Sequence, residues 1–183
     1  MQQRRGMNSR PRSILALSGS LRATSINSAF CRVLSRLAPA ETNVICHVGL
    51  GDLPLFNPDL EIAPPAVVMK FRETVAAADA LLIASPEYAH GISGVLKNAL
   101  DWLVSFEGVV GKPVALVNTS PRAHHAHDSL AEVLRTMSLE IVAGASLVIP
   151  LLGHVRTDRE MAASPEVSAA AKTIFGALAA HSR

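Results

Sequence analysis

The sequence has little that would place it in a membrane or hold it together with disulfides. Its 183 residues include only two cysteines, and no apolar run is long enough to cross a bilayer. Cys31 falls in a predicted helix and Cys46 in a predicted strand, a spacing that supports neither a disulfide nor a redox pair. Buried free thiols are typical of cytosolic proteins. We therefore expect a cytoplasmic protein with no membrane partner, built around one core.

Positive charge is also scarce over most of the chain. The net charge is +2, but four arginines lie in the first twelve residues, which contain no acid. Without these four charges, +2 becomes −2. Binding to nucleic acid needs concentrated positive charge on the folded domain, so we expect no nucleic-acid partner. We predict a disordered basic tail over residues 1–12 and a single domain over residues 13–183.

Short apolar runs alternate with helical patterns along the rest of the chain. Strands are predicted at residues 13–17, 43–48, 80–84, 114–118 and 147–149. Helices are predicted around residues 29–34, 64–78, 93–104, 129–138 and 165–181. This alternation predicts an α/β fold, an open parallel sheet with helices on both faces. Ligands of such sheets bind at the carboxyl ends of the strands, so the loops after the first, third and fourth strands should carry the chemistry.

The first of these loops, residues 18–27, is rich in hydrogen-bond donors and precedes a helix. Helix N-termini bind anions readily, because their backbone N–H groups are unpaired and the helix dipole is positive there. The loop lacks the lysine of a P-loop and has one glycine, Gly19, where a dinucleotide fingerprint needs three. The pattern favours a single phosphate monoester, although serine and threonine are also common helix caps.

The loop after the third strand, residues 85–94, combines an acid, an aromatic ring and two glycines. Glycine lets the backbone approach a flat ligand closely, and backbone donors can satisfy ring heteroatoms. The alternative is a turn stiffened by proline before a capped helix.

Two motifs make a family resemblance specific. The first is Ser18-Gly19-Ser20-Leu21-Arg22-x-x-Ser25-x-Asn27. The second is Pro86-Glu87-Tyr88-x-x-Gly91-x-x-Gly94-x-x-Lys97-Asn98-x-x-Asp101-Trp102. From Ser13 to about Pro150 the chain resembles the NADPH-dependent FMN reductase family. The resemblance implies a flavodoxin-like fold with a five-stranded parallel sheet in the order 2-1-3-4-5, the cofactors FMN and NADPH, and a homodimer or homotetramer.

The resemblance also implies roles for individual residues. The FMN phosphate would be held by Ser18, Ser20, Arg22, Ser25 and Asn27. The isoalloxazine ring would be lined by Pro86, Glu87, Tyr88 and Gly91, with Thr119 and Ser120 at its polar edge. The last four residues of the second motif would anchor the following helix and a subunit interface. No general acid or base and no metal ligand is assigned.

The loop after the fourth strand departs from the family pattern. Members often carry a glycine-rich stretch here, whereas this chain has bulky Arg122, His124, His125 and His127. The histidine spacing matches no structural zinc pattern, so we expect solvated loop histidines rather than a metal site. The charge of Arg122 could attract the extra phosphate of NADPH.

The expected function is an FMN-dependent oxidoreductase that passes a hydride from NADPH to a small acceptor such as a quinone, an azo compound, an oxidised metal or a flavin. One alternative is a flavodoxin-like FMN carrier that does not oxidise NADPH. Another is a phosphate-ester enzyme without flavin. A receiver-like signalling domain is excluded, because Ser85 and Pro86 follow the third strand where that fold needs an aspartate.

Overall fold

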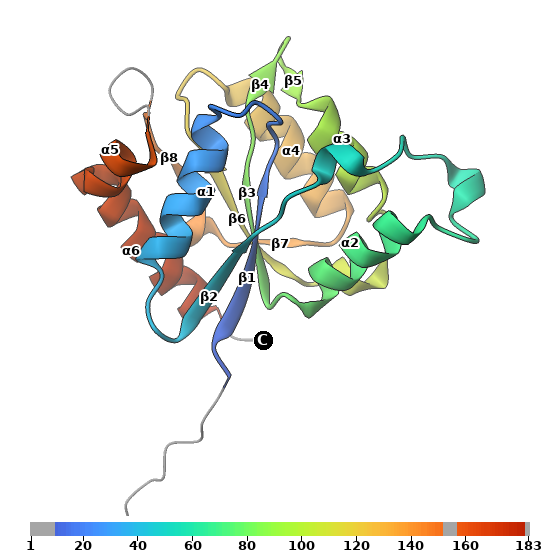
Figure 1. Ribbon diagram of the computed structural model, residues 1–183, viewed down its shortest axis with the longest axis horizontal. Coiled ribbons are helices and arrows are strands. Elements are labelled where there is room, and N and C mark those ends of the chain that lie inside the picture. The colour runs from blue at the N-terminus through green and yellow to red at the C-terminus, as the bar shows by residue number, and fades with distance from the viewer. Residues whose placement is uncertain (1–9, 152–156, 182–183) are drawn as a thin grey trace, which may run out of the picture.

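The computed structural model describes residues 10–151 and 157–181. A parallel sheet has the strand order β2-β1-β3-β6-β7, and β8 also pairs with β6 (Figure 1). The strands of this sheet are β1 (Arg12–Ser18), β2 (Thr42–Cys46), β3 (Ala80–Ala84), β6 (Pro113–Asn118), β7 (Glu140–Ile141) and β8 (Leu147–Val148). A separate antiparallel hairpin consists of β4 (Glu87–Tyr88) and β5 (Gly91–Ile92).

Six α-helices are described, together with four short 3-10 helices. The α-helices are α1 (Ile26–Leu37), α2 (Ala66–Ala77), α3 (Gly94–Asp101), α4 (His124–Thr136), α5 (Asp158–Ala163) and α6 (Pro165–Ala180). The 3-10 helices are η1 (Leu50–Asp52), η2 (Pro58–Leu60), η3 (Glu107–Val109) and η4 (Ala143–Ala145). No helix within the described ranges is long and apolar enough to span a membrane.

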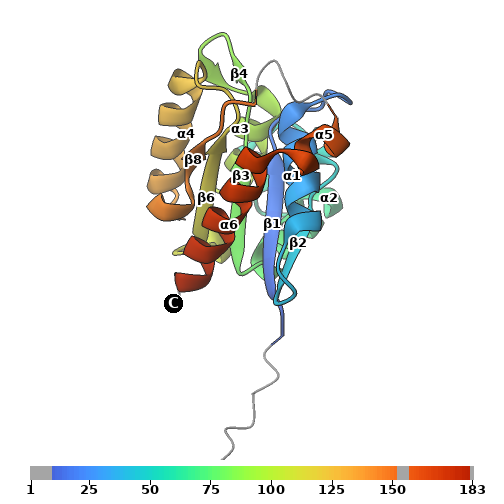
Figure 2. The ribbon, with the colours of Figure 1, turned by 90° about the vertical axis from the view of Figure 1, so that its left-hand side faces the viewer.

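The sheet separates two hydrophobic cores because its strands alternate their side chains between faces. Ile14 and Ala16 of β1 pack with buried residues of α1, α5 and α6. Leu15 and Leu17 point the other way, into a core shared with α2, α3 and α4. Figure 2 shows α1, α5 and α6 in front of the sheet. A strand buried on both faces must be apolar throughout, which explains the continuous hydrophobic run of β3.

The predicted α/β, flavodoxin-like strand order is confirmed, with one difference at the fifth position. The predicted strand there is divided into β7, which pairs with the start of β6, and β8, which pairs with its end. The turn η4 lies between them. Ser146 bridges the interruption: its Oγ accepts the Leu116 N–H at 3.1 Å and donates to the Val142 carbonyl at 3.0 Å. A side chain thus satisfies the backbone group that the divided strand leaves unpaired.

The boundary predicted at residue 12 differs slightly from the structure. Arg12 begins β1, and Arg10 forms a two-pronged ion pair with Asp79 at 2.6 and 2.9 Å. The rest of the predicted tail, residues 1–9, lies outside the described residues. The sequence analysis also missed the short helix α5 and the β4–β5 hairpin.

An ion pair joins α5 to α1. Asp158 accepts from Arg32 Nη2 at 2.7 Å and Nε at 2.9 Å, and Arg36 lies at 3.3 Å. The hydrogen bond from Arg32 is the main reason why the pKa of Asp158 lies below its usual value. A carboxyl group whose pKa is lowered by folding stabilises the fold above its unfolded pKa, about 3.9, and loses that contribution as the pH falls through the folded pKa.

We expect Asp158→Asn to lower the free energy of unfolding by about 0.5–1 kcal/mol at neutral pH, because the pair is partly solvated. The difference from wild type should shrink at pH values below the usual aspartate range, where the wild-type carboxyl is also neutral. Urea denaturation across pH measures both effects. Asp59→Asn, at an exposed residue with no ion pair in the described part of the chain, is the control. A difference that stays constant with pH would refute this account.

Candidate functional site

Three loops converge at the carboxyl ends of β1, β3 and β6. The strands end level with one another, because Ser18 pairs with Ala84 and Ala84 with Val117. The loops enclose a cleft of about 690 Å³. Its lining residues are Ser20, Arg22, Thr24, Ser25, Ile26, Asn27, Ser85, Pro86, Glu87, Tyr88, Thr119, Ser120, Arg122 and Ala123. The structure therefore brings together most of the predicted site residues, at the edge of the sheet where the fold class places ligands.

The N-terminus of α1 forms one wall of the cleft. Ser25 caps the helix, and its Oγ accepts the Ser28 N–H at 3.2 Å. The first turn of α1 contains no acid, so its dipole and free backbone donors are not neutralised locally. Ser25 thus serves as a cap, which was the alternative reading, and it also lines the cleft. This wall is suited to an anion.

The cleft carries two exposed cations and one carboxylate. Among the described residues, Arg22 and Arg122 have no ion pair, and both line the cleft from different loops. The carboxylate is Glu87, and it is already engaged by other protein groups. The electrostatics of the lining therefore favour a negatively charged ligand.

The hairpin β4–β5 is held against α4 by Glu87. Its Oε2 accepts the Ala126 N–H in the first turn of α4 at 2.9 Å, and its Oε1 lies 3.1 Å from His90 Nδ1. The hydrogen bond from Ala126 is the main cause that holds the pKa of Glu87 below its usual value. Glu87 was expected to line a flavin ring. It does line the cleft, but its charge is used to cap a helix 39 residues further along the chain.

The tip of this hairpin contains two residues with left-handed backbone. Ala89 has φ 49° and His90 has φ 59°, values that glycine adopts without steric cost. We expect Ala89→Gly to raise the free energy of unfolding by about 0.5–1 kcal/mol, since it relieves the contact between Cβ and the backbone. Thermal denaturation measures the gain. Ala169→Gly, on the exposed side of α6, should lower stability by a similar amount, and a loss at both positions would contradict the strain at residue 89.

The three histidines expected in a loop lie instead in the first turns of α4. The predicted helix began at Ser129, whereas α4 begins at His124. Its N-cap, Ala123, offers no side-chain hydrogen bond, so the local sequence carries no start signal. Glu87 provides the cap from a distant element. No group of three or more metal-ligating side chains suited to a metal ion occurs in the part of the chain that the structure describes.

The loop after β6 keeps its shape without glycine. Asn118, which is buried, accepts the Ser120 N–H through Oδ1 at 2.9 Å and donates from Nδ2 to the Ala123 carbonyl at 3.0 Å. These two bonds fold residues 119–123 into a compact turn. The turn brings Ser120 and Arg122 to the cleft.

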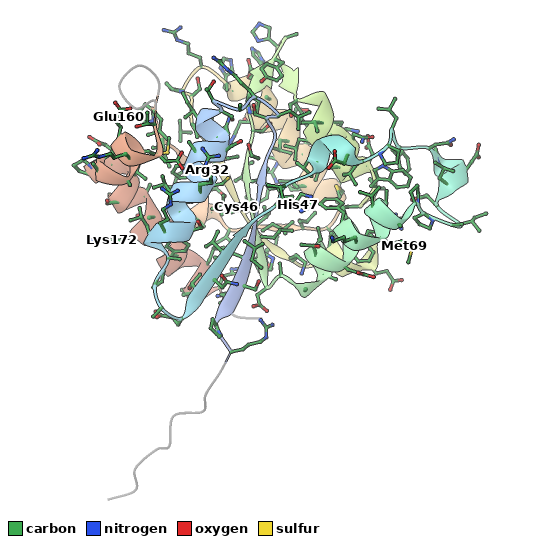
Figure 3. All side chains as sticks on the ribbon, in the orientation of Figure 1. Arg32, Cys46, His47, Met69, Glu160 and Lys172 are labelled. Atoms are coloured by element: carbon green, nitrogen blue, oxygen red, sulfur yellow. The ribbon has the colours of Figure 1, made fainter. Side chains whose placement is uncertain are left out.

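Ser18 and Gly91 do not line the cleft, although both were predicted as part of the site. Ser18 Oγ pairs with Ser28 Oγ at 2.8 Å and faces a smaller cavity of about 320 Å³ behind the loop, because strand alternation directs its side chain away from the cleft. That cavity also contacts Arg32, Cys46 and His47, which Figure 3 labels. Gly91 pairs with Tyr88 in the hairpin.

The end of the second motif anchors the following helix, as expected. Asn98 accepts the Phe56 N–H at 2.8 Å, and both Asn98 and the indole of Trp102 donate to the Pro54 carbonyl, at 3.0 and 2.8 Å. Lys97 pairs with Asp101 at 2.6 Å. These contacts fix the loop 53–56 against α3.

Gly19 lies directly after β1, where the loop of residues 18–27 leaves the sheet. A Cβ built on it would lie 2.6 Å from Ser85 Oγ and 2.9 Å from Ser93 Oγ. The Ser93 hydroxyl is buried and has no hydrogen-bond partner among the described atoms. The sequence analysis did not assign Ser85, Thr24, Ile26 or Ala123 to the site. Their position directly beside the strand ends and the helix start was the available signal.

The chain is similar to known proteins in sequence and in fold. The model of the NADPH-dependent FMN reductase family matches residues 12–150. A quinone reductase of Pseudomonas putida is 42% identical over 115 residues, which cover 61% of each chain. A 2-hydroxy-1,4-benzoquinone reductase of a Burkholderia species is 41% identical over 110 residues, 58% of this chain and 60% of that protein. The matched segments thus span less than two thirds of these relatives.

Among solved structures, the flavoenzyme NAD(P)H:(acceptor) oxidoreductase FerB of Paracoccus denitrificans superposes with a TM-score of 0.77. The sequences are 25% identical, and the match covers 93% of this chain and 98% of that one. An apo NADH:FMN oxidoreductase, 23% identical with a TM-score of 0.64, shares the fold over 93% of this chain and 90% of its own.

Proposed function

The chain belongs to the NADPH-dependent FMN reductase family, and on this premise we propose that it is an FMN-dependent NAD(P)H oxidoreductase that reduces a small acceptor. The observation that carries the proposal is the cleft itself. It joins an anion-binding helix terminus, two arginines without ion pairs in the described residues, and a pocket between two loops at the carboxyl edge of the sheet.

The residues present fit FMN. A phosphate monoester needs backbone donors, hydroxyls and a cation, which the α1 terminus, Ser20 and Arg22 supply. The cleft volume, about 690 Å³, lies within the usual range for cofactor sites. A planar ring needs a slot with few competing charges, and the carboxylate of Glu87 is turned to α4. The cleft thus supplies donors for the phosphate and, on the ring side, leaves no unengaged carboxylate among its lining residues.

In this proposal the phosphate is held by Ser20, Arg22, Ser25 and Asn27, and the ring is bounded by Pro86, Tyr88 and Ser120. Glu87 acts by keeping the hairpin against α4. The chemistry that bound FMN supplies is transfer of a hydride from NADPH and onward reduction of the acceptor. We assign no general acid or base, because bound FMN would carry the hydride chemistry and the protein would supply orientation and electrostatics.

Quinones are the acceptor class that the named relatives favour, and an azo compound, an oxidised metal or a free flavin would use the same chemistry. We also propose that the protein is cytoplasmic, that residues 13–183 form one domain, and that it assembles as a homodimer or homotetramer. Exposed apolar side chains on and before α2, including Ile62 and Met69, support assembly.

The test is NADPH oxidation by the purified protein loaded with FMN, with and without a benzoquinone, compared with protein stripped of flavin. We expect turnover that requires both FMN and the quinone. Protein that binds FMN but does not oxidise NADPH or NADH would instead be a flavin carrier. Protein that oxidises neither nucleotide and binds no flavin would exclude both functions.

A further inference from the structure

We infer that Thr119 contributes to binding the phosphate of the ligand rather than its ring. It does so indirectly, by orienting the side-chain amide of Asn27. This inference rests on the proposed function, since it concerns how the same cleft distinguishes FMN from riboflavin, which lacks the phosphate. It assigns Thr119 a positioning role different from the ring contact that the resemblance to the family implied.

A buried hydrogen bond carries the argument. Thr119 Oγ1 donates to Asn27 Oδ1 at 2.8 Å, and it joins the loop after β6 to the first turn of α1 across 92 residues. Thr119 is 4% exposed and Asn27 is 6% exposed, so water competes little for this bond. Both residues nevertheless line the cleft.

The direction of this bond determines what Asn27 can offer a ligand. An asparagine amide has one acceptor, Oδ1, and two donor hydrogens on Nδ2. Thr119 occupies Oδ1. Nδ2 has no hydrogen-bond partner among the described residues, yet it is not sealed from solvent as Ser93 Oγ is. Since Asn27 lines the cleft beside the α1 terminus, this donor faces the ligand space.

A fixed donor matters because a fully ionised phosphate has no hydrogen to donate and therefore only accepts hydrogen bonds. If the amide were rotated by half a turn, Oδ1 would face the phosphate and repel it. Without the threonine hydroxyl, the two orientations of Asn27 become closer in energy, and the ligand must select the productive one. Hydrogen bonds to charged groups contribute more than neutral ones, so the loss should fall on the phosphate.

The Thr119 hydroxyl therefore cannot donate to a ring edge while it donates to Asn27. Its hydrogen is donated to Asn27, and its side chain is nearly buried. The neighbouring Ser120 is half-buried and lines the cleft, so it is the hydroxyl available to a ring edge.

The experiment compares the affinities of FMN and riboflavin by fluorescence quenching in wild type, Thr119→Val and Thr119→Ser. We expect Thr119→Val to weaken FMN binding by about 10-fold and riboflavin binding by less than about 2-fold, a selective loss typical of one charge-assisted hydrogen bond. Thr119→Ser keeps the hydroxyl and should restore the wild-type ratio. Thr173→Val, on the exposed face of α6, is the matched control.

A double-mutant cycle with Asn27→Ala separates positioning from packing. Once Asn27 is truncated, adding Thr119→Val should not change the FMN-to-riboflavin ratio further. Far-ultraviolet circular dichroism and the thermal midpoint establish that each variant folds. If Thr119→Val lowers the affinities for FMN and riboflavin by the same factor, or changes neither affinity, the inference is wrong while FMN binding stands. If wild type binds neither flavin, the proposed function and the inference fail together.

Discussion

Replacing Arg22 with alanine is expected to weaken FMN binding by about 10- to 100-fold without unfolding the protein. The guanidinium lines the cleft beside the α1 terminus and has no ion pair among the described residues, so none of their acids competes for it. A charge-assisted hydrogen bond to phosphate contributes roughly 1.5–3 kcal/mol, and each 1.4 kcal/mol or so is a factor of ten.

The expected loss has a second signature. Arg22 is exposed, so salt should screen its attraction, and the gap between wild type and Arg22→Ala should narrow as ionic strength rises. Isothermal titration with FMN at two salt concentrations measures both effects. Arg135→Ala removes a cation near the far end of α4 and should bind FMN as wild type does. An unchanged FMN affinity for Arg22→Ala would show that Arg22 does not hold the phosphate and would count against the first loop as its binding site.

Gly19→Ala is expected to lower the free energy of unfolding by about 1–3 kcal/mol and to weaken flavin binding. The added methyl would lie 2.6 Å from Ser85 Oγ, 3.1 Å from Ser85 Cβ and 2.9 Å from Ser93 Oγ. Contacts this short force side chains or backbone to move, and overpacking has costs of this order. The Gly19 N–H also donates to the Ala84 carbonyl at 2.8 Å, so the end of β3 would shift with it.

Urea denaturation gives the stability change, and the flavin titration gives the functional one. Gly176→Ala is the matched control, because it lies within α6 and a Cβ there meets no atom within 4 Å. That variant should gain about 0.5–1 kcal/mol, since alanine favours helix more than glycine does. If Gly19→Ala were as stable as wild type, the close packing of Ser85 and Ser93 on the loop would be wrong.

The sequence predicted the sheet and the location of the site because both depend on local patterns. Continuous apolar runs mark strands buried on both faces, and donors that follow such a run mark the ligand edge. These patterns pointed to the loops that contain Arg22 and Tyr88, and the resemblance to the family implied the roles of the two residues.

The contacts that shape the cleft could not be predicted in the same way, because each joins distant parts of the chain. Glu87 caps α4 through Ala126, so the helix begins five residues before its local sequence indicates. The bond between Thr119 and Asn27 spans 92 residues, and residue type alone did not reveal it. Ser18 was predicted to belong to the site but does not line the cleft, for another reason. The motif includes this residue, but the alternation of side chains along β1 determines which way it points.

The visible absorption spectrum of the protein reconstituted with FMN, recorded before and after anaerobic NADPH, tests the central claim most directly. The account predicts a flavin spectrum that remains with the protein after gel filtration and bleaches when NADPH is added. Bound flavin that stays oxidised with both NADPH and NADH would contradict the oxidoreductase function and leave a carrier. Protein that elutes without flavin would contradict the assignment of the cleft itself.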